Sequence, residues 1–182
     1  YDTPNILQTV GKYEDPITWN GGHIGRGEED RGQYEEICER YFADDVFTLV
    51  SKKLYSEIGG YDKTFAFQSE EYDWQARAKA AGYKIMYTPY AKIWHKDSMT
   101  IGKVSAFKLY YDSRNPFIVI MKYKEPAFVK RYFRSHLKDI IRTSLVNIKR
   151  LKFVVALSVW KGFFSGIWWG IKNKKFKLRY IV

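Results

Sequence analysis

Three carboxylates packed into four residues, Glu70, Glu71 and Asp73, and a later histidine, His95, are the side chains best suited to chemistry. Clustered acids at a helix start can move protons and bind divalent cations, and a histidine can assist in either task. Acids in a first helical turn are also common for structural reasons, because the helix dipole stabilises negative charge there. The apolar residues 65–67 just before them favour a place beside a cleft, and therefore a functional role.

The spacing of these acids indicates different tasks for them. Arg77 follows Asp73 by four residues, in the acid-to-base order that stabilises an ion pair on a helix. We therefore expect Asp73 and Arg77 to form a structural pair. That leaves Glu70 or Glu71 as the free carboxylate for chemistry.

The histidines carry weaker signals. His95 follows a strand-like segment that ends at Trp94, where a side chain can reach a cleft, although a polar cap at a strand end is the simpler interpretation. His23 and His136 have no acids or other histidines at a spacing that indicates a catalytic or metal site, and both are predicted to lie at the surface.

The elements that position these side chains are short in the first part of the chain. A helix over 52–58, closed by Gly59 and Gly60, precedes a second helix that is predicted to start after Ser69 as its N-cap and to end at Gly82. Strands are predicted over residues 6–10, 44–50, 83–87 and 91–94.

The chain after Lys103 is predicted to be helical. A helix over 104–115 is expected to be interrupted by Pro116, and Pro126 suits the first turn of the next helix. Residues 153–171 are apolar except for Lys161. Small residues spaced by four along this segment predict close helix packing, against the preceding amphipathic helix: Ser158, Gly162, Gly166 and Gly170.

The charge is unevenly distributed. Residues 1–102 hold 12 Lys+Arg and 17 Asp+Glu, whereas residues 103–182 hold 19 and 3, so the two parts carry −5 and +16. A basic tail indicates an anionic partner, either nucleic acid or a membrane surface. The single cysteine, Cys38, excludes an intrachain disulfide and fits a reducing compartment.

The tail fits a membrane surface better than nucleic acid. Its basic residues alternate with a large apolar face that nucleic acid does not need. Lys161, near the middle of the apolar segment, disfavours spanning, and the aromatic residues with flanking Lys and Arg suit the headgroup region. We expect residues 126–179 to bind an anionic membrane surface without crossing it.

The sequence from Gly59 to His95 resembles the C-terminal part of the catalytic domain of family-two inverting glycosyltransferases, and the rhamnosyltransferase-like subgroup most closely. The residues that carry this resemblance are Gly59-Gly60-Tyr61-Asp62, Phe65, Glu70-Glu71-x-Asp73, Arg77, Ala81-Gly82-Tyr83-Lys84-Ile85, Pro89, Ala91 and Ile93-Trp94-His95. Residues 23–34 and the run Tyr110-Tyr111-x-x-Arg114-Asn115 are similar to the same subgroup.

The resemblance implies an α/β class and a GT-A-like fold that transfers a sugar from a nucleotide-sugar donor to a saccharide or lipid-linked acceptor, with Mg²⁺ or Mn²⁺. It implies that Glu71 is the base for the acceptor hydroxyl and that His95 helps to hold the metal or the diphosphate. The candidate site residues are Glu71, Glu70 and Asp73 as catalytic, Trp74, Phe65 and Arg77 as acceptor-binding, and His95 as metal-binding.

The Asp-x-Asp motif of this family does not occur in the sequence. We therefore expect residues 1–103 to be the acceptor-side half of a catalytic domain whose donor-side half precedes it. On this view, residues 104–182 are a basic amphipathic helical tail. We expect this chain alone to be inactive and to hold no tightly bound cofactor, and we expect a cytoplasmic, peripheral place at the membrane.

Two other functions stay open at this stage. One is a membrane-surface interaction domain without catalysis, for which a Glu71 substitution would leave activity intact. The other is a nucleic-acid-binding module driven by the basic tail, which should show a steep salt dependence of binding.

Overall fold

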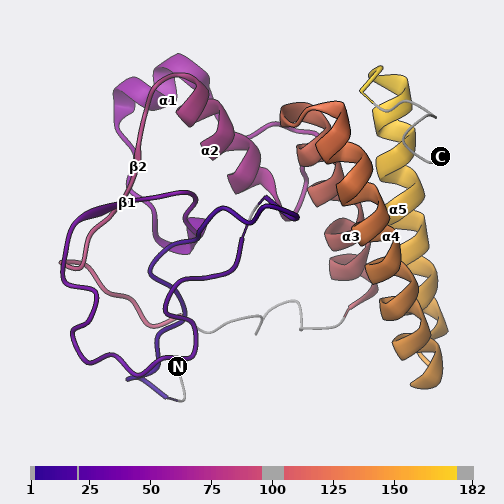
Figure 1. The fold of residues 1–182 in the computed structure, drawn as a ribbon, viewed down its shortest axis with the longest axis horizontal. Coiled ribbons are helices and arrows are strands. Elements are labelled where there is room, and N and C mark those ends of the chain that lie inside the picture. The colour runs from indigo at the N-terminus through magenta and orange to yellow at the C-terminus, as the bar shows by residue number, and fades with distance from the viewer. Residues whose placement is uncertain (1–2, 20, 96–104, 176–182) are drawn as a thin grey trace. The chain divides into compact units, whose positions relative to one another are not determined.

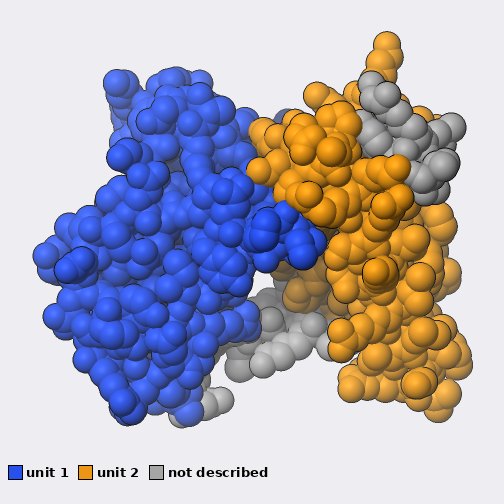
Figure 2. Space-filling model, viewed as in Figure 1, with its two compact units in different colours: residues 1–63, 70–97 blue, residues 64–69, 98–182 orange. Residues whose placement is uncertain are grey.

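The computed structural model describes residues 3–19, 21–95 and 105–175. Its described residues form five α-helices, one 3₁₀ helix and a two-stranded sheet (Figure 1). This mixture of helix and sheet is compatible with the α/β class expected from the sequence. The chain divides into two compact units (Figure 2): unit 1 is Tyr1–Lys63 with Glu70–Asp97, and unit 2 is Thr64–Ser69 with Ser98–Val182.

Unit 1 is held together largely by loops. Strands β1 (Cys38–Arg40) and β2 (Ile85–Tyr87) pair antiparallel, with Glu39 opposite Met86. Isolated bridges connect other loop residues, and Phe42 is fully buried among edge-to-face aromatic contacts with Trp19 and Tyr72. Aromatic packing therefore replaces an extensive sheet in this unit.

Helices α1 (Lys52–Ile58) and α2 (Glu70–Ala80) form where the sequence predicts them. The Ser51 hydroxyl caps α1 by accepting a hydrogen bond from the Leu54 backbone N–H at 3.1 Å. Gly59 ends α1 and Gly82 follows α2, both with the positive φ that glycine adopts without strain, 73° and 86°. The two helices pack through a small apolar cluster of Leu54, Trp74 and Ala78.

The predicted strand over 44–50 is wrong. Asp45–Phe47 form the 3₁₀ helix η1, and the apolar residues after it point to solvent, with Leu49 100% exposed. A β-prone run needs a neighbouring strand and a surface to pack on, and no described strand pairs with this one. Residues 6–10 and 91–94 likewise form no named strand, although Ile6 makes an isolated bridge to Glu29.

Unit 2 contains three long helices that lie side by side and alternate in direction: α3 (Ala106–Tyr123), α4 (Pro126–Lys149) and α5 (Phe153–Lys172) (Figure 1). Pro126 occupies the first turn of α4, as predicted. The predicted interruption at Pro116 is wrong, because α3 continues through it. The loss of one backbone hydrogen bond at the proline is offset by packing, since Phe117, Ile118 and Ile120 just beyond it are buried.

Gly162 and Gly166 of α5 pack against α3 rather than against α4 as expected. A Cβ at Gly162 would lie only 2.1 Å from the Tyr110 carbonyl oxygen, and one at Gly166 would lie 3.1 Å from that of Arg114. The two backbones approach so closely at Gly162 that a side chain there does not fit. The prediction of close packing by small residues is confirmed, while its partner helix was wrong.

His136 was predicted at the surface and is instead buried in unit 2. Its Nε2–H donates to the Ser113 carbonyl at 2.7 Å, and its ring packs against Tyr132 and Phe117. Burial lowers the pKa of His136, and the bond to Ser113 opposes that shift only in part.

Candidate functional site

Three carboxylates of unit 1 converge where η1 meets the first turn of α2. Ligand oxygens of Asp45, Glu70 and Glu71 all lie within 4.8 Å of one another. Glu70 and Glu71 are half-buried and Asp45 is exposed, so the group opens to solvent on one side. The sequence indicated two of these acids and missed Asp45, which lay inside the incorrectly predicted strand.

This arrangement raises the proton affinity of the acids. Burial, with smaller contributions from the nearby Asp45 and Glu70 carboxylates, raises the pKa of Glu71 to about 7, while Lys12 opposes the shift. Burial also raises the pKa of Glu70, whose Oε2 is buried without a hydrogen-bond partner. Glu71 therefore exchanges its proton near neutral pH, as a general base does.

A tyrosine completes the group. Burial raises the pKa of Tyr61, and the neighbouring Asp45, Glu70 and Glu71 raise it further. The Tyr61 ring also packs edge-to-face on Trp74 at 6.3 Å between centroids. The Tyr61 hydroxyl therefore lies near the acids, and its ring is held by the contact with Trp74.

The backbone directly before the acids is strained. Gln68 and Ser69 have left-handed φ values of 66° and 70°, which cost roughly 1–3 kcal/mol each for residues other than glycine. Ser69 was predicted as the N-cap of α2, but its left-handed φ differs from the extended backbone that N-cap residues usually adopt. Within unit 2, the buried Asn115 side chain holds this segment by donating to the carbonyls of Phe67 and Gln68, at 2.7 and 2.8 Å.

Arg114 holds the same segment from the preceding position of α3. Its Nη1 donates to the Thr64 carbonyl at 3.0 Å and to the Asn115 side chain, and its Nε donates to Ser165 of α5. Strained backbone with dedicated supports is typical of functional sites. The Arg-Asn pair noted in the sequence thus has a visible task, which is to fix the loop that leads into Glu70.

Asp73 lies apart from this cluster. Its side chain is 0% exposed, and its Oδ2 accepts from Arg77 Nε at 3.1 Å, so the predicted structural pair is confirmed. Arg77 also donates to the carbonyls of Ile58 and Gly60, which ties α2 to the end of α1. Asp73 and Arg77 are structural groups in this arrangement, although Asp73 was a catalytic candidate and Arg77 an acceptor contact.

The two aromatic acceptor candidates are also packed inside. Trp74 donates from its indole N–H to the Gly59 carbonyl at 2.7 Å and is buried with Leu54. Phe65 belongs to unit 2, where it is buried with the Lys122 ammonium 5.3 Å from its ring centroid. Both side chains shape the supporting structure more than they offer a surface to a ligand.

His95 is not brought to the acids, because the described carboxylate group within 4.8 Å does not include it. Its Nδ1 lies 3.2 Å from the Gln8 amide oxygen, and it lines a hollow of about 1020 Å³ in unit 1. Asp44 and Val46 line this hollow as well, on either side of Asp45 in the sequence.

A second polar group in unit 1 was not predicted. Lys12 is buried, and its ammonium donates to the Tyr72 hydroxyl and lies 2.8 Å from Oδ1 of Asp44. The other carboxylate oxygen of Asp44 lies 3.3 Å from Nδ1 of His23. Burial would lower the pKa of Lys12, but Tyr72 and Asp44 together raise it. His23 is therefore half-buried and paired, not a free surface residue, and nothing in its sequence spacing indicated this.

The donor set of the acid cluster fits a hard divalent cation. Mg²⁺ and Mn²⁺ prefer oxygen ligands, and three carboxylates whose oxygens lie within 4.8 Å of one another could supply them, with Glu71 deprotonated. The same three groups could instead share a proton at neutral pH. Among the residues that the structure describes, Asp45, Glu70 and Glu71, and not His95, are thus the group that could hold a metal.

Comparisons with known proteins add no further information. No family model, curated protein or solved structure matches the chain.

Proposed function

We propose that unit 1 is the acceptor-side part of an inverting, metal-assisted glycosyltransferase of GT-A type, in which Glu71 takes the proton from the acceptor hydroxyl. The observation that carries this proposal is the convergence of Glu71 with Asp45 and Glu70 at the start of α2. The pairing of Asp73 with Arg77 supports it, because Glu70 and Glu71 are then the carboxylates of this motif left for chemistry.

The proposed step is a single displacement. The acceptor O–H gives its proton to the Glu71 carboxylate, and the acceptor oxygen forms a bond to the anomeric carbon of the donor sugar. The bond from that carbon to the nucleotide diphosphate breaks, and the diphosphate leaves with the electron pair. Asp45 and Glu70 would hold a divalent metal, with Glu71 left free as the base, and the metal would supply positive charge to neutralise the leaving diphosphate.

The residues of this chain have three tasks in that step. Glu71 accepts the proton, because burial, with help from its neighbours Asp45 and Glu70, raises its pKa to about 7. Tyr61 places a hydroxyl beside the acids for the acceptor. Asn115 and Arg114 fix the strained segment from which Glu70 and Glu71 emerge.

The protein encoded by the whole gene is the right test object, because the proposal assigns donor binding to residues outside this chain. Release of nucleoside diphosphate from a panel of nucleotide sugars, including nucleotide-linked rhamnose, would be measured with saccharide and lipid-linked acceptors. Glu71→Gln should lower turnover by about 10²–10⁴-fold, the usual contribution of a general base. Donor binding should change little.

Two matched variants give this experiment its control. Glu36→Gln alters an exposed acid of unit 1 outside the cluster and should leave turnover unchanged. Glu70→Gln should have a smaller effect than Glu71→Gln. Near-normal turnover in Glu71→Gln with a severe loss in Glu70→Gln would transfer the role to Glu70, and near-normal turnover in both would remove the cluster from catalysis.

A further inference from the structure

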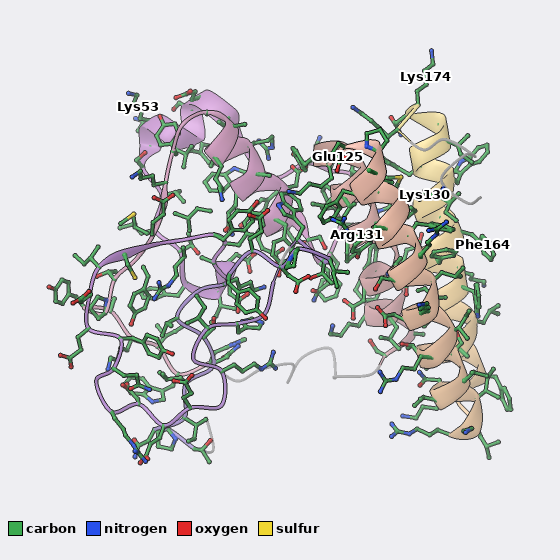
Figure 3. All side chains as sticks on the ribbon, viewed as in Figure 1. Lys53, Glu125, Lys130, Arg131, Phe164 and Lys174 are labelled. Carbon is green, nitrogen blue, oxygen red and sulfur yellow. The ribbon has the colours of Figure 1, made fainter. Side chains whose placement is uncertain are left out.

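The outward face of α5 is an exposed apolar stripe. Five large apolar side chains recur along it at spacings of three and four residues, with Lys161 in the only gap: Val154, Leu157, Phe164, Trp168 and Ile171. Val154 is 74% exposed and Trp168 is 66% exposed. Over these residues the stripe is about 26 Å long, at 1.5 Å per residue. Figure 3 shows Phe164 directed away from α3 and α4.

The opposite face of α5 is fully engaged inside unit 2. Gly162 meets the backbone of α3, Val159 and Phe163 are buried, and Ser165 bonds to the Tyr110 hydroxyl at 3.0 Å. The exposed stripe is therefore not a core face left open by loose packing. It is a second apolar face on a helix whose first face is already covered.

The surroundings of the stripe are strongly cationic. Residues 126–175 hold twelve Lys and Arg residues and a single acid, Asp139. Lys149 and Lys152 lie at the turn that leads into α5, and Lys172 and Lys174 lie at its other end, where Figure 3 shows Lys174 beyond the helix. An apolar stripe with basic residues at both ends matches the surface of an anionic bilayer, where negatively charged headgroups cover the apolar acyl chains.

Helix α5 is long and apolar enough by length and composition to cross a membrane, but a core helix can pass the same test. Its packing argues against crossing. Insertion of α5 would carry α3 and α4 with it, and α4 exposes Arg131, Arg134 and Lys138 along its length. Charged side chains in the hydrocarbon region are costly, whereas binding with α5 parallel to the surface leaves them in water.

We propose that the outer face of α5 is a docking surface for an anionic lipid bilayer, on which unit 2 lies without spanning it. The Trp168 and Phe164 side chains enter the headgroup boundary, and the lysines at both ends of the helix pair with lipid phosphates. This proposal rests on unit 2 alone and does not depend on the sugar transfer proposed for unit 1.

The direct experiment uses the full 182-residue chain and lipid vesicles. Binding to vesicles of phosphatidylcholine with about a third phosphatidylglycerol, and of phosphatidylcholine alone, would be measured by co-sedimentation and by Trp fluorescence. Binding should be at least tenfold tighter with the anionic lipid. It should weaken at least tenfold in 1 M salt, where the screening length falls to about 3 Å.

Variants locate the surface. The double variant Phe164→Glu/Trp168→Glu should lose at least tenfold in affinity, because it places charge in the stripe. The matched control Leu49→Glu, at a fully exposed apolar residue of unit 1, should bind as the parent does. A charge variant, Lys149→Gln/Lys152→Gln/Lys161→Gln, should weaken binding to the anionic vesicles and not to the neutral ones. Circular dichroism checks that each variant keeps its helices.

Several results would overturn the proposal. Equal vesicle binding by the double Glu variant and the parent would exclude this face. Binding that survives both 1 M salt and alkaline carbonate would mean that α5 inserts. If the chain does not bind vesicles but forms a dimer in analytical ultracentrifugation, and the double Glu variant loses that dimer, the stripe is a contact surface for a second copy of the chain. Salt-sensitive RNA binding without vesicle binding would assign the charge to nucleic acid.

Discussion

Substitution of Glu71 by Gln should stabilise the folded chain at neutral and alkaline pH. The folded state holds a proton on Glu71 with a pKa of about 7, whereas the reference value for an unperturbed Glu is 4.5. Between these two pH values the folded state binds a proton that the unfolded state does not. The free energy of unfolding of the parent therefore falls as the pH rises through this range.

The size of this effect follows from the two pKa values. Each pKa unit corresponds to about 1.4 kcal/mol, so a shift from 4.5 to about 7 gives at most about 3 kcal/mol. Gln does not titrate and has nearly the shape of protonated Glu. The two proteins should then be similarly stable near pH 4.5, and Glu71→Gln should be more stable by up to about 3 kcal/mol near pH 8.

Urea unfolding followed by Trp fluorescence at several pH values measures this difference directly. Subtraction of the parent from the variant cancels the titrating groups that do not interact with Glu71, whereas Glu70 and Tyr61, which do, add smaller contributions to the difference. Glu36→Gln, at an exposed position, serves as the control and should show a flat difference. A flat difference for Glu71→Gln as well would refute the reasoning, because Glu71 would then not be a destabilised, half-buried carboxylate.

Other substitutions test the supporting structure. Gly162→Ala should destabilise unit 2 by about 2–3 kcal/mol in thermal unfolding, because its Cβ meets a backbone oxygen of α3 at 2.1 Å. Gly166→Ala, whose Cβ lies 3.1 Å from such an oxygen, should cost less, and equal effects would contradict the packing. Asn115→Ala should cost about 2–3 kcal/mol and lower transfer activity by loosening the strained segment; unchanged activity would separate that segment from the site. Unit 2 should lose stability as the pH falls below about 6.5, because folding lowers the pKa of His136, and a His136→Gln variant should lose that acid sensitivity.

Local signals in the sequence predicted the helices well. Glycines with positive φ ended α1 and α2, the Pro at the start of α4 behaved as a first-turn residue, and the four-residue spacing of Asp73 and Arg77 gave the expected ion pair. Each of these features depends on residues within one helical turn, so the neighbouring sequence is sufficient to predict it.

Features that depend on distant partners were not predictable in the same way. Residues 44–50 have the composition of a strand, but no described strand pairs with them, and Asp45–Phe47 within them form η1 instead. That error also hid Asp45, which reaches the acids only because η1 lies beside the start of α2. Pro116 was read as a break because its local cost is visible in the sequence, whereas the burial of Phe117 and Ile118 beyond it is not.

The pH dependence of sugar transfer tests the role of Glu71 most directly. The rate of nucleoside diphosphate release by the protein encoded by the whole gene, with donor and acceptor well below saturation, would be followed from about pH 5 to pH 9. A base with a pKa of about 7 predicts a rate that rises through neutral pH to a plateau, and a Glu71→Gln variant whose small residual rate lacks this rise. The same rise at full amplitude in Glu71→Gln would contradict the assignment of Glu71 as the base.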